Sequence, residues 1–317
     1  ASARAVVETL GALAVTTING KGILPPDHPL SLGSTLPQPP VLDELTHADV
    51  VLAVGTELGE TDTLLFDSRL RLGGKVIRVD IDPEQLTRNV LAEVAILSDS
   101  DLALRSLAGE LQQHKADVPT AQARAQSLRV KLQDLLTGPQ RAHQRFMSAL
   151  QEALPGVVVA GDSTQPVYSA NLFYQAERSR SYFNSSTGYG TLGYALPAAL
   201  GAKLAQRDRP VVALIGDGGL QFTIGELATA VELSLPLTIL VWNNRGYGEI
   251  KKYMAERGIP QIGVDIYTPD FLAIARSFGC QAIRAESLAH LQDQLRQAQR
   301  APGPTLIEID EASALRW

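Results

Sequence analysis

Cysteine is almost absent from this chain, because Cys280 is the only one among its 317 residues. No internal disulfide can form, so nothing points to an oxidising compartment and we expect a cytoplasmic protein. The apolar stretch around Cys280 predicts a buried, unreactive thiol. The five histidines are scattered without the spacing of metal ligands, which argues against a histidine-based metal centre.

Long apolar runs and basic clusters are also missing. No stretch approaches the roughly 18 apolar residues that a membrane span requires. No local basic patch offsets the net charge of −6, which argues against nucleic acid as the main partner. The GxSxG sequence of hydrolase nucleophiles does not occur. We therefore expect neither a membrane nor a nucleic acid as a partner, and no serine-hydrolase chemistry.

Both halves of the chain alternate short β-rich runs with helical patterns. In the first half, apolar runs predict a strand at 14–18 and buried parallel strands at 50–54, 75–79 and 94–97. In the second half they predict strands at 157–160, 181–184, 211–215, 237–242, 281–283 and 305–309. Helices are expected at 3–13, 43–48, 102–114, 141–153, 192–205, 224–233, 270–278 and 288–299. This alternation is typical of the α/β class, here with two doubly wound parallel-sheet domains.

Changes in composition along the chain divide it into two domains. We expect a central α/β domain over residues 1–117 and a second parallel α/β domain over residues 141–317. The interval 118–140 is rich in Gln and Arg and ends near a Gly-Pro pair, which predicts a surface linker with helical propensity. Because a parallel sheet normally places a strand before its first helix, we expect the first domain to lack its first strand.

The most informative stretch is GDGG followed by a helix, a strand and paired asparagines. Asp217 follows the apolar run at 211–215, and Asn244 follows the run at 237–242. Neighbouring parallel strands end at one edge of a sheet, so these two side chains can meet there. A carboxylate, an amide oxygen and the carbonyl of Gly246 leave room at Mg²⁺ for phosphate oxygens and a water. The pattern predicts a magnesium–diphosphate site, with a strand-end turn capped by Asp and Asn as the alternative.

The GDGG…NN pattern resembles the diphosphate motif of thiamine-diphosphate-dependent enzymes of the pyruvate decarboxylase and acetolactate synthase group. TTINGKGILPPDHPLSLG and GTELGETD are similar to the central domain of that group, and residues 141–317 to its diphosphate-binding domain. The resemblance implies thiamine diphosphate as cofactor, with Asp217, Asn244 and the Gly246 carbonyl as Mg²⁺ ligands. Some relatives hold FAD or ADP in the central domain. Because residues 1–117 show no such fingerprint, we expect a flavoprotein-like domain without a nucleotide.

Four residues beside these ligands are expected to contact the diphosphate. Gly218 and Gly219 have no side chains, so their N–H groups can approach phosphate at a helix start. Tyr247 and Gly248 directly follow the Gly246 ligand, and by the same resemblance they flank the diphosphate.

The segment TGYGTLGYALPAALGAK contains GxGxxG at Gly188, Gly190 and Gly193, the spacing of a dinucleotide-binding turn. The next strand ends in GDG rather than in an acidic residue placed to bind ribose, so we reject that function. In the resembled family this segment lies under the bend of the cofactor. The resemblance makes Leu192 the apolar residue that forces the cofactor rings together, and the Gly190 carbonyl the acceptor for the pyrimidine amino group. Core packing at a helix start is the alternative for Leu192.

Polar residues after the run at 157–160, and one just beyond Gly248, are also candidates. The resemblance implies that Thr164 and Gln165 contact the far end of the diphosphate, with helix capping as the alternative. Glu249 begins a helix that is expected to face the reactive carbon, and we expect it to take part in catalysis. The glutamate that assists proton transfer in simple decarboxylases of the group aligns with Ile250, one residue later. A carboxylate at the favourable end of a helix dipole is the alternative for Glu249.

The resemblance implies non-oxidative decarboxylation of a 2-oxo acid with thiamine diphosphate and Mg²⁺. GDSTQPVYS and NNRGYGEIKKY are most similar to the decarboxylases of 5-guanidino-2-oxopentanoate in arginine breakdown. A guanidinium tail pairs well with a carboxylate, and Asp162 and Glu249 are candidates for that contact. Carboligation of the acetolactate synthase type and a non-catalytic diphosphate-binding fragment are the alternatives.

In the resembled family, active sites lie between two subunits and use a glutamate of an N-terminal pyrimidine-binding domain. Residues 1–317 show no counterpart of that domain, so we expect it to precede residue 1. The resemblance further implies a homodimer or homotetramer, and we expect no turnover by this chain alone.

Overall fold

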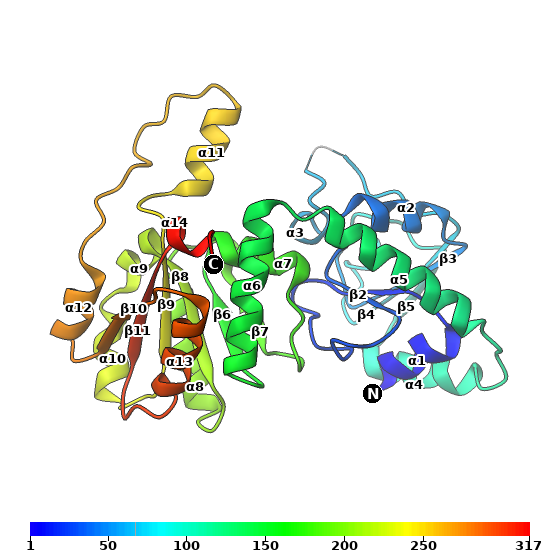
Figure 1. Ribbon diagram of the computed structural model, residues 1–317. Helices are drawn as coiled ribbons and strands as arrows, with labels where there is room; N and C mark the ends of the chain where they lie inside the picture. The colour runs from blue at the N-terminus through cyan, green and yellow to red at the C-terminus, as the bar shows by residue number, and fades with distance from the viewer. Residues whose placement is uncertain (67) are drawn as a thin grey trace. The chain divides into compact units, whose positions relative to one another are not determined.

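The computed structural model describes residues 1–66 and 68–317. The chain divides into two compact units (Figure 1): residues 1–136 with 175–179 form the first, and residues 137–174 with 180–317 form the second. Both units are α/β and build parallel sheets. Within the described part of the chain, no helix combines the length and apolar character needed to span a bilayer.

The first unit contains a parallel pair of short strands and a separate three-stranded parallel sheet in the order β3-β4-β5. Its strands are β1 (Ala14–Val15), β2 (Ser31–Gly33), β3 (Val50–Val54), β4 (Lys75–Asp80) and β5 (Val94–Leu97). Its helices are α1 (Ser2–Leu10), α2 (Pro39–His47), α3 (Glu60–Thr63), α4 (Ser100–Glu110) and α5 (Val118–Asp134).

Strand β5 has the predicted bounds, but the prediction that it is buried is wrong. All four of its residues are exposed, with Leu97 at 60%. Among residues 1–66 and 68–317, the strand pairs with β4 along one edge only. An apolar run therefore predicts extended backbone here, but it does not distinguish a covered strand from one at the edge of a sheet.

Helix α5 occupies most of the interval expected to link the domains, and it packs within the first unit. Ala125 and Leu128 are buried against Leu32 and Val41. The Arg129 guanidinium donates to the backbone carbonyls of His28 and Pro29, in the loop before β2, and of Ser31, the first residue of β2. The unit boundary then falls between residues 136 and 137, where Thr137 and Gln140 form a capping box that begins α6.

The second unit is built on a six-stranded parallel sheet in the order β10-β11-β9-β8-β6-β7. Its strands are β6 (Val158–Gly161), β7 (Tyr182–Asn184), β8 (Val211–Gly216), β9 (Thr238–Asn243), β10 (Gln281–Arg284) and β11 (Thr305–Asp310). Its helices are α6 (Gly138–Ala153), α7 (Gln165–Phe173), the 3-10 turn η1 (Ser185–Thr187), α8 (Ala195–Ala205), α9 (Asp217–Thr223), α10 (Glu226–Glu232), α11 (Gly248–Glu256), α12 (Phe271–Ser277), α13 (Leu288–Ala298) and α14 (Glu311–Ala314).

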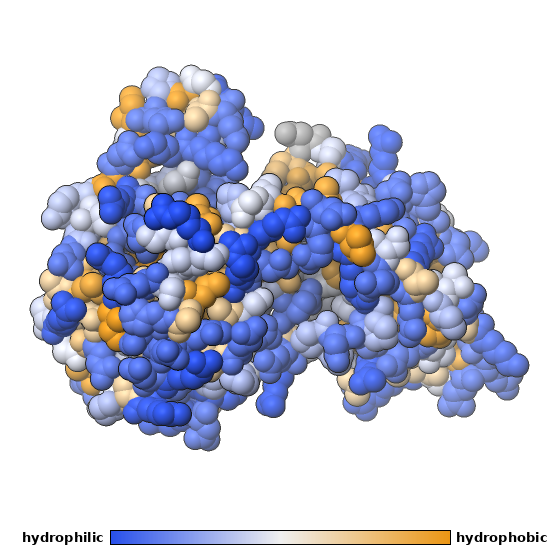
Figure 2. Space-filling view, in the orientation of Figure 1, coloured by the Kyte–Doolittle hydropathy of each residue, from blue (hydrophilic) through white to orange (hydrophobic). Residues whose placement is uncertain are grey.

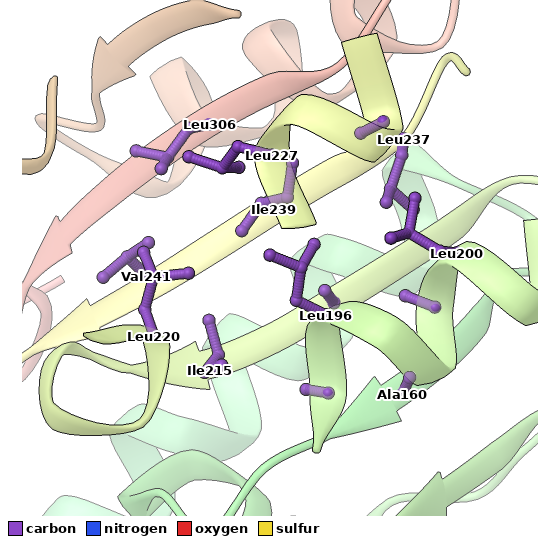
Figure 3. Packing of buried hydrophobic residues seen from close by; sticks show 14 of the residues in the cluster. Ala160, Leu196, Leu200, Ile215, Leu220, Leu227, Leu237, Ile239, Val241 and Leu306 are labelled. Atoms are coloured by element: carbon purple, nitrogen blue, oxygen red, sulfur yellow. The ribbon is translucent and has the colours of Figure 1, made fainter. Parts of the chain in front are cut away.

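Helices cover both faces of this sheet, as expected for a doubly wound fold. Residues 211–215 of β8 are all buried, although alternate side chains of a strand point to opposite faces. Figure 3 shows one of the two layers, where Leu196 of α8, Leu220 of α9 and Leu227 of α10 pack over Ile215 and Ile239. Burying each such leucine contributes roughly 1.5–3 kcal/mol. This packing fixes the start of α9 at the carboxyl end of β8.

The order of the strands also identifies where a ligand would bind. The chain proceeds from β6 outward to β7, and then returns to β8 on the other side of β6. This reversal is a topological switch point, and α/β sheets bind ligands at the carboxyl ends of strands beside such a point. The segments that follow β6 and β8 there contain Thr164, Gln165 and Asp217.

The second unit also corrects the expected start of one helix. The helix predicted over residues 192–205 begins at Ala195. Gly190 and Gly193 adopt φ values of +68° and +86°, a left-handed conformation that cannot continue a right-handed helix. Residues 188–194 therefore form a loop at the sheet edge rather than the first turn of α8.

Candidate functional site

The predicted meeting of Asp217 and Asn244 is found in the structure. Strands β8 and β9 are parallel neighbours, and Gly216 is in register with Trp242. Asp217 begins α9 with 1% of its surface exposed, and the half-buried Asn244 directly follows β9. The two side chains come from adjacent strand ends and contact each other at the edge of the sheet.

The Asn244 carboxamide meets two oxygen atoms at this point. One end of the amide lies 2.8 Å from the Gly246 carbonyl oxygen and 3.1 Å from Asp217 Oδ1, and with its NH₂ group at that end it donates to both. If the amide turns over, its oxygen faces the same two acceptors, and three acceptors stay together only with a cation between them. Two neighbouring ligands in octahedral Mg²⁺ coordination at 2.0–2.1 Å are about 3 Å apart. The residues present therefore fit a magnesium ion.

The second Asp217 oxygen, Oδ2, stabilises the turn that follows β9. The Gly246 N–H donates to Asp217 Oδ2 over 3.0 Å, so the carboxylate holds the turn that presents the Gly246 carbonyl. Burial raises the pKa of the Asp217 carboxyl, and backbone N–H groups oppose that rise. A bound cation would favour the charged form further.

No group of three or more His, Cys, Asp or Glu side chains that could hold a metal occurs in residues 1–66 and 68–317. The predicted centre does not require such a group, since it has one carboxylate, one amide and one carbonyl. Mg²⁺ commonly takes its remaining ligands from substrate phosphates and water. The donor set thus suits a cation that arrives with a diphosphate.

Close packing explains the glycines of both motifs. A Cβ atom at Gly218 would lie 2.7 Å from Tyr247 Cε1, and one at Gly219 would lie 2.9 Å from Asp162 Oδ1. On the other side of the turn, a Cβ at Gly246 would lie 2.6 Å from the Val264 carbonyl oxygen. These separations are well below normal contact distances, so the site has no room for side chains at these positions.

Two further predicted residues complete this turn. Tyr247 donates its N–H to the Val264 carbonyl over 2.9 Å, and its ring lies against Gly218. A Cβ at Gly248 would lie 2.6 Å from the Asn244 amide nitrogen. Tyr247 and Gly248 are therefore in contact with the residues predicted to bind the cation and diphosphate.

The structure contradicts Asp162 as a contact for a substrate guanidinium. Asp162 is fully buried. Its Oδ1 accepts from the Ser163 N–H at 2.9 Å and its Oδ2 accepts from the Ala195 N–H at 3.0 Å. Burial raises the pKa of this carboxyl, against the opposing effect of these N–H groups. Asp162 instead anchors the start of α8, 33 residues further along the chain.

Gln165 and Glu249 come together from the first turns of two separate helices. Gln165 Nε2 donates to Glu249 Oε2 over 2.7 Å. Glu249 is exposed in the first turn of α11, and Gln165 begins α7. Thr164 is buried beside them, with its hydroxyl close to Gly216 at the end of β8. The three predicted residues therefore lie at the carboxyl edge of the same sheet, and Glu249 is accessible to a ligand.

Gly190 and Leu192 lie in the loop before α8. The Gly190 carbonyl accepts a hydrogen bond from Ser163 Oγ over 3.2 Å, and Leu192 is half-buried. Ser163 also contacts the hydroxyl of Ser185 at 2.9 Å. Ser163 was not among the predicted site residues, although its position in GDSTQ, directly after a strand end, could have indicated it.

Helix α11 projects from the second unit (Figure 1), and none of its nine residues is buried. Ile250 and Tyr253 are about half exposed on it. Figure 2 shows apolar surface on this projecting segment. The helix begins at the Gly246–Gly248 turn, so it extends the candidate site outward from the sheet edge.

Two family profiles match this chain. The C-terminal TPP binding domain of thiamine pyrophosphate enzymes matches residues 162–309, which include Asp217, Asn244 and Gly246. The central domain of the same enzymes matches residues 1–107. The chain belongs to the thiamine pyrophosphate enzyme family. In the order of the chain, the first unit corresponds to the central domain of that family and the second to its TPP-binding domain.

Curated relatives agree with this assignment. The chain is 40% identical over 312 residues to a probable 2-ketoarginine decarboxylase, AruI, of Pseudomonas aeruginosa, covering 98% of this chain and 55% of that protein. It is 32% identical to a probable acetolactate synthase large subunit of Methanocaldococcus jannaschii, covering 95% and 53%. It is 30% identical to the chloroplastic acetolactate synthase 1 of Oryza sativa subsp. japonica, covering 96% and 50%. The chain thus spans about half the length of the curated relatives it matches.

Proposed function

We propose that this chain provides the central and diphosphate-binding domains of an enzyme that decarboxylates a 2-oxo acid without oxidation, using thiamine diphosphate and Mg²⁺. The observation that supports this most directly is the contact of the Asn244 amide with the Gly246 carbonyl oxygen at 2.8 Å and with Asp217 Oδ1 at 3.1 Å, separations close to those of neighbouring Mg²⁺ ligands. We further propose 5-guanidino-2-oxopentanoate, which is 2-ketoarginine, as the substrate. The relative at 40% identity supports this choice.

When bound, thiamine diphosphate supplies an electron sink for cleavage of the bond to the carboxylate carbon. The chain's own residues hold and orient that group. Asp217, Asn244 and the Gly246 carbonyl would hold the cation, and Leu192 would support the bend of the cofactor. The Gly190 carbonyl, which now accepts from Ser163, would accept from the pyrimidine amino group. Holding the cofactor in this way lowers the entropic cost of bringing it and the substrate into the reactive orientation.

Glu249 is proposed to face the substrate. Its carboxylate is exposed, and Gln165 fixes one oxygen at 2.7 Å while the other can accept a further hydrogen bond. A planar guanidinium pairs well with such a carboxylate. With Asp162 buried, Glu249 is the remaining one of the two predicted contacts for a cationic tail. If Glu249 also transfers a proton, its carboxylate would do so from this position beside Gln165.

One experiment tests the cation site. Asp217→Ala should weaken Mg²⁺-dependent binding of thiamine diphosphate by about 100-fold or more, because even outer-shell partners of metal ligands are worth 10–100-fold. Binding can be measured by titration calorimetry on the complete gene product. Asp208→Ala, an exposed aspartate in the turn before β8, provides the control. Unchanged affinity in Asp217→Ala would refute the proposed site.

A second experiment tests the substrate. The complete gene product is assayed for CO₂ release from 5-guanidino-2-oxopentanoate and from pyruvate. The proposal predicts a kcat/KM at least tenfold higher for the guanidino acid, and Glu249→Gln should lower that preference mainly through KM. Equal use of both acids, or a preference for pyruvate, would contradict the proposed substrate.

Carboligation of the acetolactate synthase type is the second candidate, because several relatives at 28–32% identity are acetolactate synthases. Formation of acetolactate from pyruvate in the same assay would favour it. Binding of the diphosphate without turnover of either acid by the complete gene product would instead favour a non-catalytic binding module.

A further inference from the structure

We propose that Glu308 and Asn243 form a positioning pair that sets the turn from which two of the three predicted cation ligands come. The inference rests on the proposed magnesium–diphosphate site. Neither residue is one of its predicted ligands. Glu308 lies on β11 and Asn243 ends β9, two strands that pair in parallel at the same sheet edge.

The first contact is a buried hydrogen bond between the two strands. Asn243 Nδ2 donates to Glu308 Oε1 over 2.7 Å, and both side chains are at least nine-tenths buried. An ionised carboxylate can only accept. Glu308 therefore requires the NH₂ end of the Asn243 amide to face it, and this fixes the direction in which the amide oxygen points.

That oxygen is used by the turn. Asn243 Oδ1 accepts from the Arg245 N–H over 3.1 Å. Arg245 has a φ of +61°, a left-handed conformation that non-glycine residues adopt only when their surroundings impose it. Arg245 stands between Asn244 and Gly246. The conformation that the Asn243 side chain supports is therefore the one that places the Asn244 amide and the Gly246 carbonyl together.

The other oxygen of Glu308 is held from the opposite side. Arg284 of β10 donates to Glu308 Oε2 through Nε at 3.0 Å and Nη2 at 2.8 Å. A charged, hydrogen-bonded partner offsets the cost of a buried carboxylate. The contacts thus run in one line from Arg284 through Glu308 and Asn243 to the Arg245 N–H.

A swap of the two side-chain types tests this line. In Asn243→Asp, a carboxylate would face Glu308, and in Glu308→Gln one amide oxygen cannot serve both Asn243 and Arg284. In the double variant, the amide introduced at position 308 can donate to the carboxylate introduced at position 243 and accept from Arg284. That carboxylate can still accept from the Arg245 N–H. The double variant therefore restores a hydrogen bond between each pair of positions that is bonded in the native protein, and positions 243 and 308 together carry the same net charge. Glu311→Ala is the matched control, because it removes a hydrogen bond of 2.6 Å from Trp242, the residue before Asn243.

Two measurements are made on the complete gene product. Mn²⁺ binding in the presence of thiamine diphosphate is followed by electron paramagnetic resonance. Hydrogen exchange of the Arg245 and Gly246 amides is followed without metal or cofactor. Each single variant should weaken Mn²⁺ binding at least tenfold and speed exchange at these two amides. The double variant should return to within about threefold of the native affinity, as expected for directly coupled residues, and Glu311→Ala should change neither quantity.

Native Mn²⁺ affinity in both single variants would overturn the inference and leave the proposed function standing. A double variant that binds Mn²⁺ as weakly as the single variants would do the same. Faster exchange across the whole sheet, rather than in the turn, would indicate general destabilisation and also overturn it. If the native protein shows no Mn²⁺-dependent binding of thiamine diphosphate, the proposed function itself fails and the inference fails with it.

Discussion

At the scale of single residues, His143 shows how burial creates a dependence of stability on pH. Its Nδ1 lies 2.8 Å from Ser169 Oγ, and its ring packs edge-on to Trp242 at 5.2 Å. Within residues 1–66 and 68–317, no hydrogen-bond partner reaches its Nε2. Burial lowers the pKa of the His143 imidazole from 6.5 to about 4, so the folded chain keeps it neutral.

The sign of the effect follows from these values. Between pH 6.5 and 4 the unfolded chain binds a proton at His143 that the folded chain does not. The neutral imidazole therefore contributes about 3 kcal/mol to stability, fully present above pH 6.5 and lost as pH falls to about 4. In urea unfolding at several pH values, the free energy of unfolding of His143→Gln should fall less steeply between pH 6.5 and 4 than that of the native chain. A profile parallel to the native one would contradict this account.

Residue chemistry also shows what the sequence alone can predict at the site. Asp217 and Asn244 were predicted to meet because each directly follows a strand end, and Gly246 lies two residues after Asn244 in the same turn. Asp162 follows a strand end as well, yet the loop before α8 covers it from 33 residues away. The contact between Asn243 and Glu308 spans 65 residues. No local pattern specifies such contacts, because they depend on which strands become neighbours.

At the scale of elements, helix α5 contributes measurably to the stability of the first unit. Arg129 on this helix donates to the backbone carbonyls of His28 and Pro29, before β2, and of Ser31, the first residue of β2. Hydrogen bonds from charged groups contribute about 1.5–3 kcal/mol. Arg129→Ala should therefore lower the free energy of unfolding by that amount in urea denaturation. Lys131→Ala, at an exposed position two residues along the same helix, should stay within about 0.5 kcal/mol of the native value.

The elements themselves were predicted well where the pattern is strong. Strands β3 and β5 have the predicted bounds, and those of β8 and β9 differ by one residue, because runs of β-branched residues bounded by glycine or asparagine are strong signals. The exposure of β5 could not be predicted, since it depends on which elements pack over the two faces of the strand. The late start of α8 depends on left-handed glycines, whose conformation the spacing of GxGxxG does not specify.

At the scale of the whole molecule, we propose that the active site also uses groups outside residues 1–317, because the chain spans about half the length of the curated relatives it matches. The resembled family pairs the diphosphate domain of one subunit with the pyrimidine-binding domain of another. We therefore propose a homodimer or homotetramer for the complete gene product. The prediction is that residues 1–317 alone retain less than about 1% of its decarboxylase activity. Sedimentation velocity and CO₂ release on both proteins would check this. Comparable turnover by the 317-residue chain would overturn the prediction.

The orientation of the Asn244 carboxamide should report whether a magnesium ion is bound. Without an ion, its NH₂ group turns toward Asp217 and Gly246, and with an ion its oxygen must turn there instead. Ion entry is thus coupled to a half-rotation of one side chain inside a crowded turn. The side-chain ¹⁵N resonance of Asn244 should move between two positions as magnesium is added, so that one nucleus records the fraction of molecules ready for the cofactor.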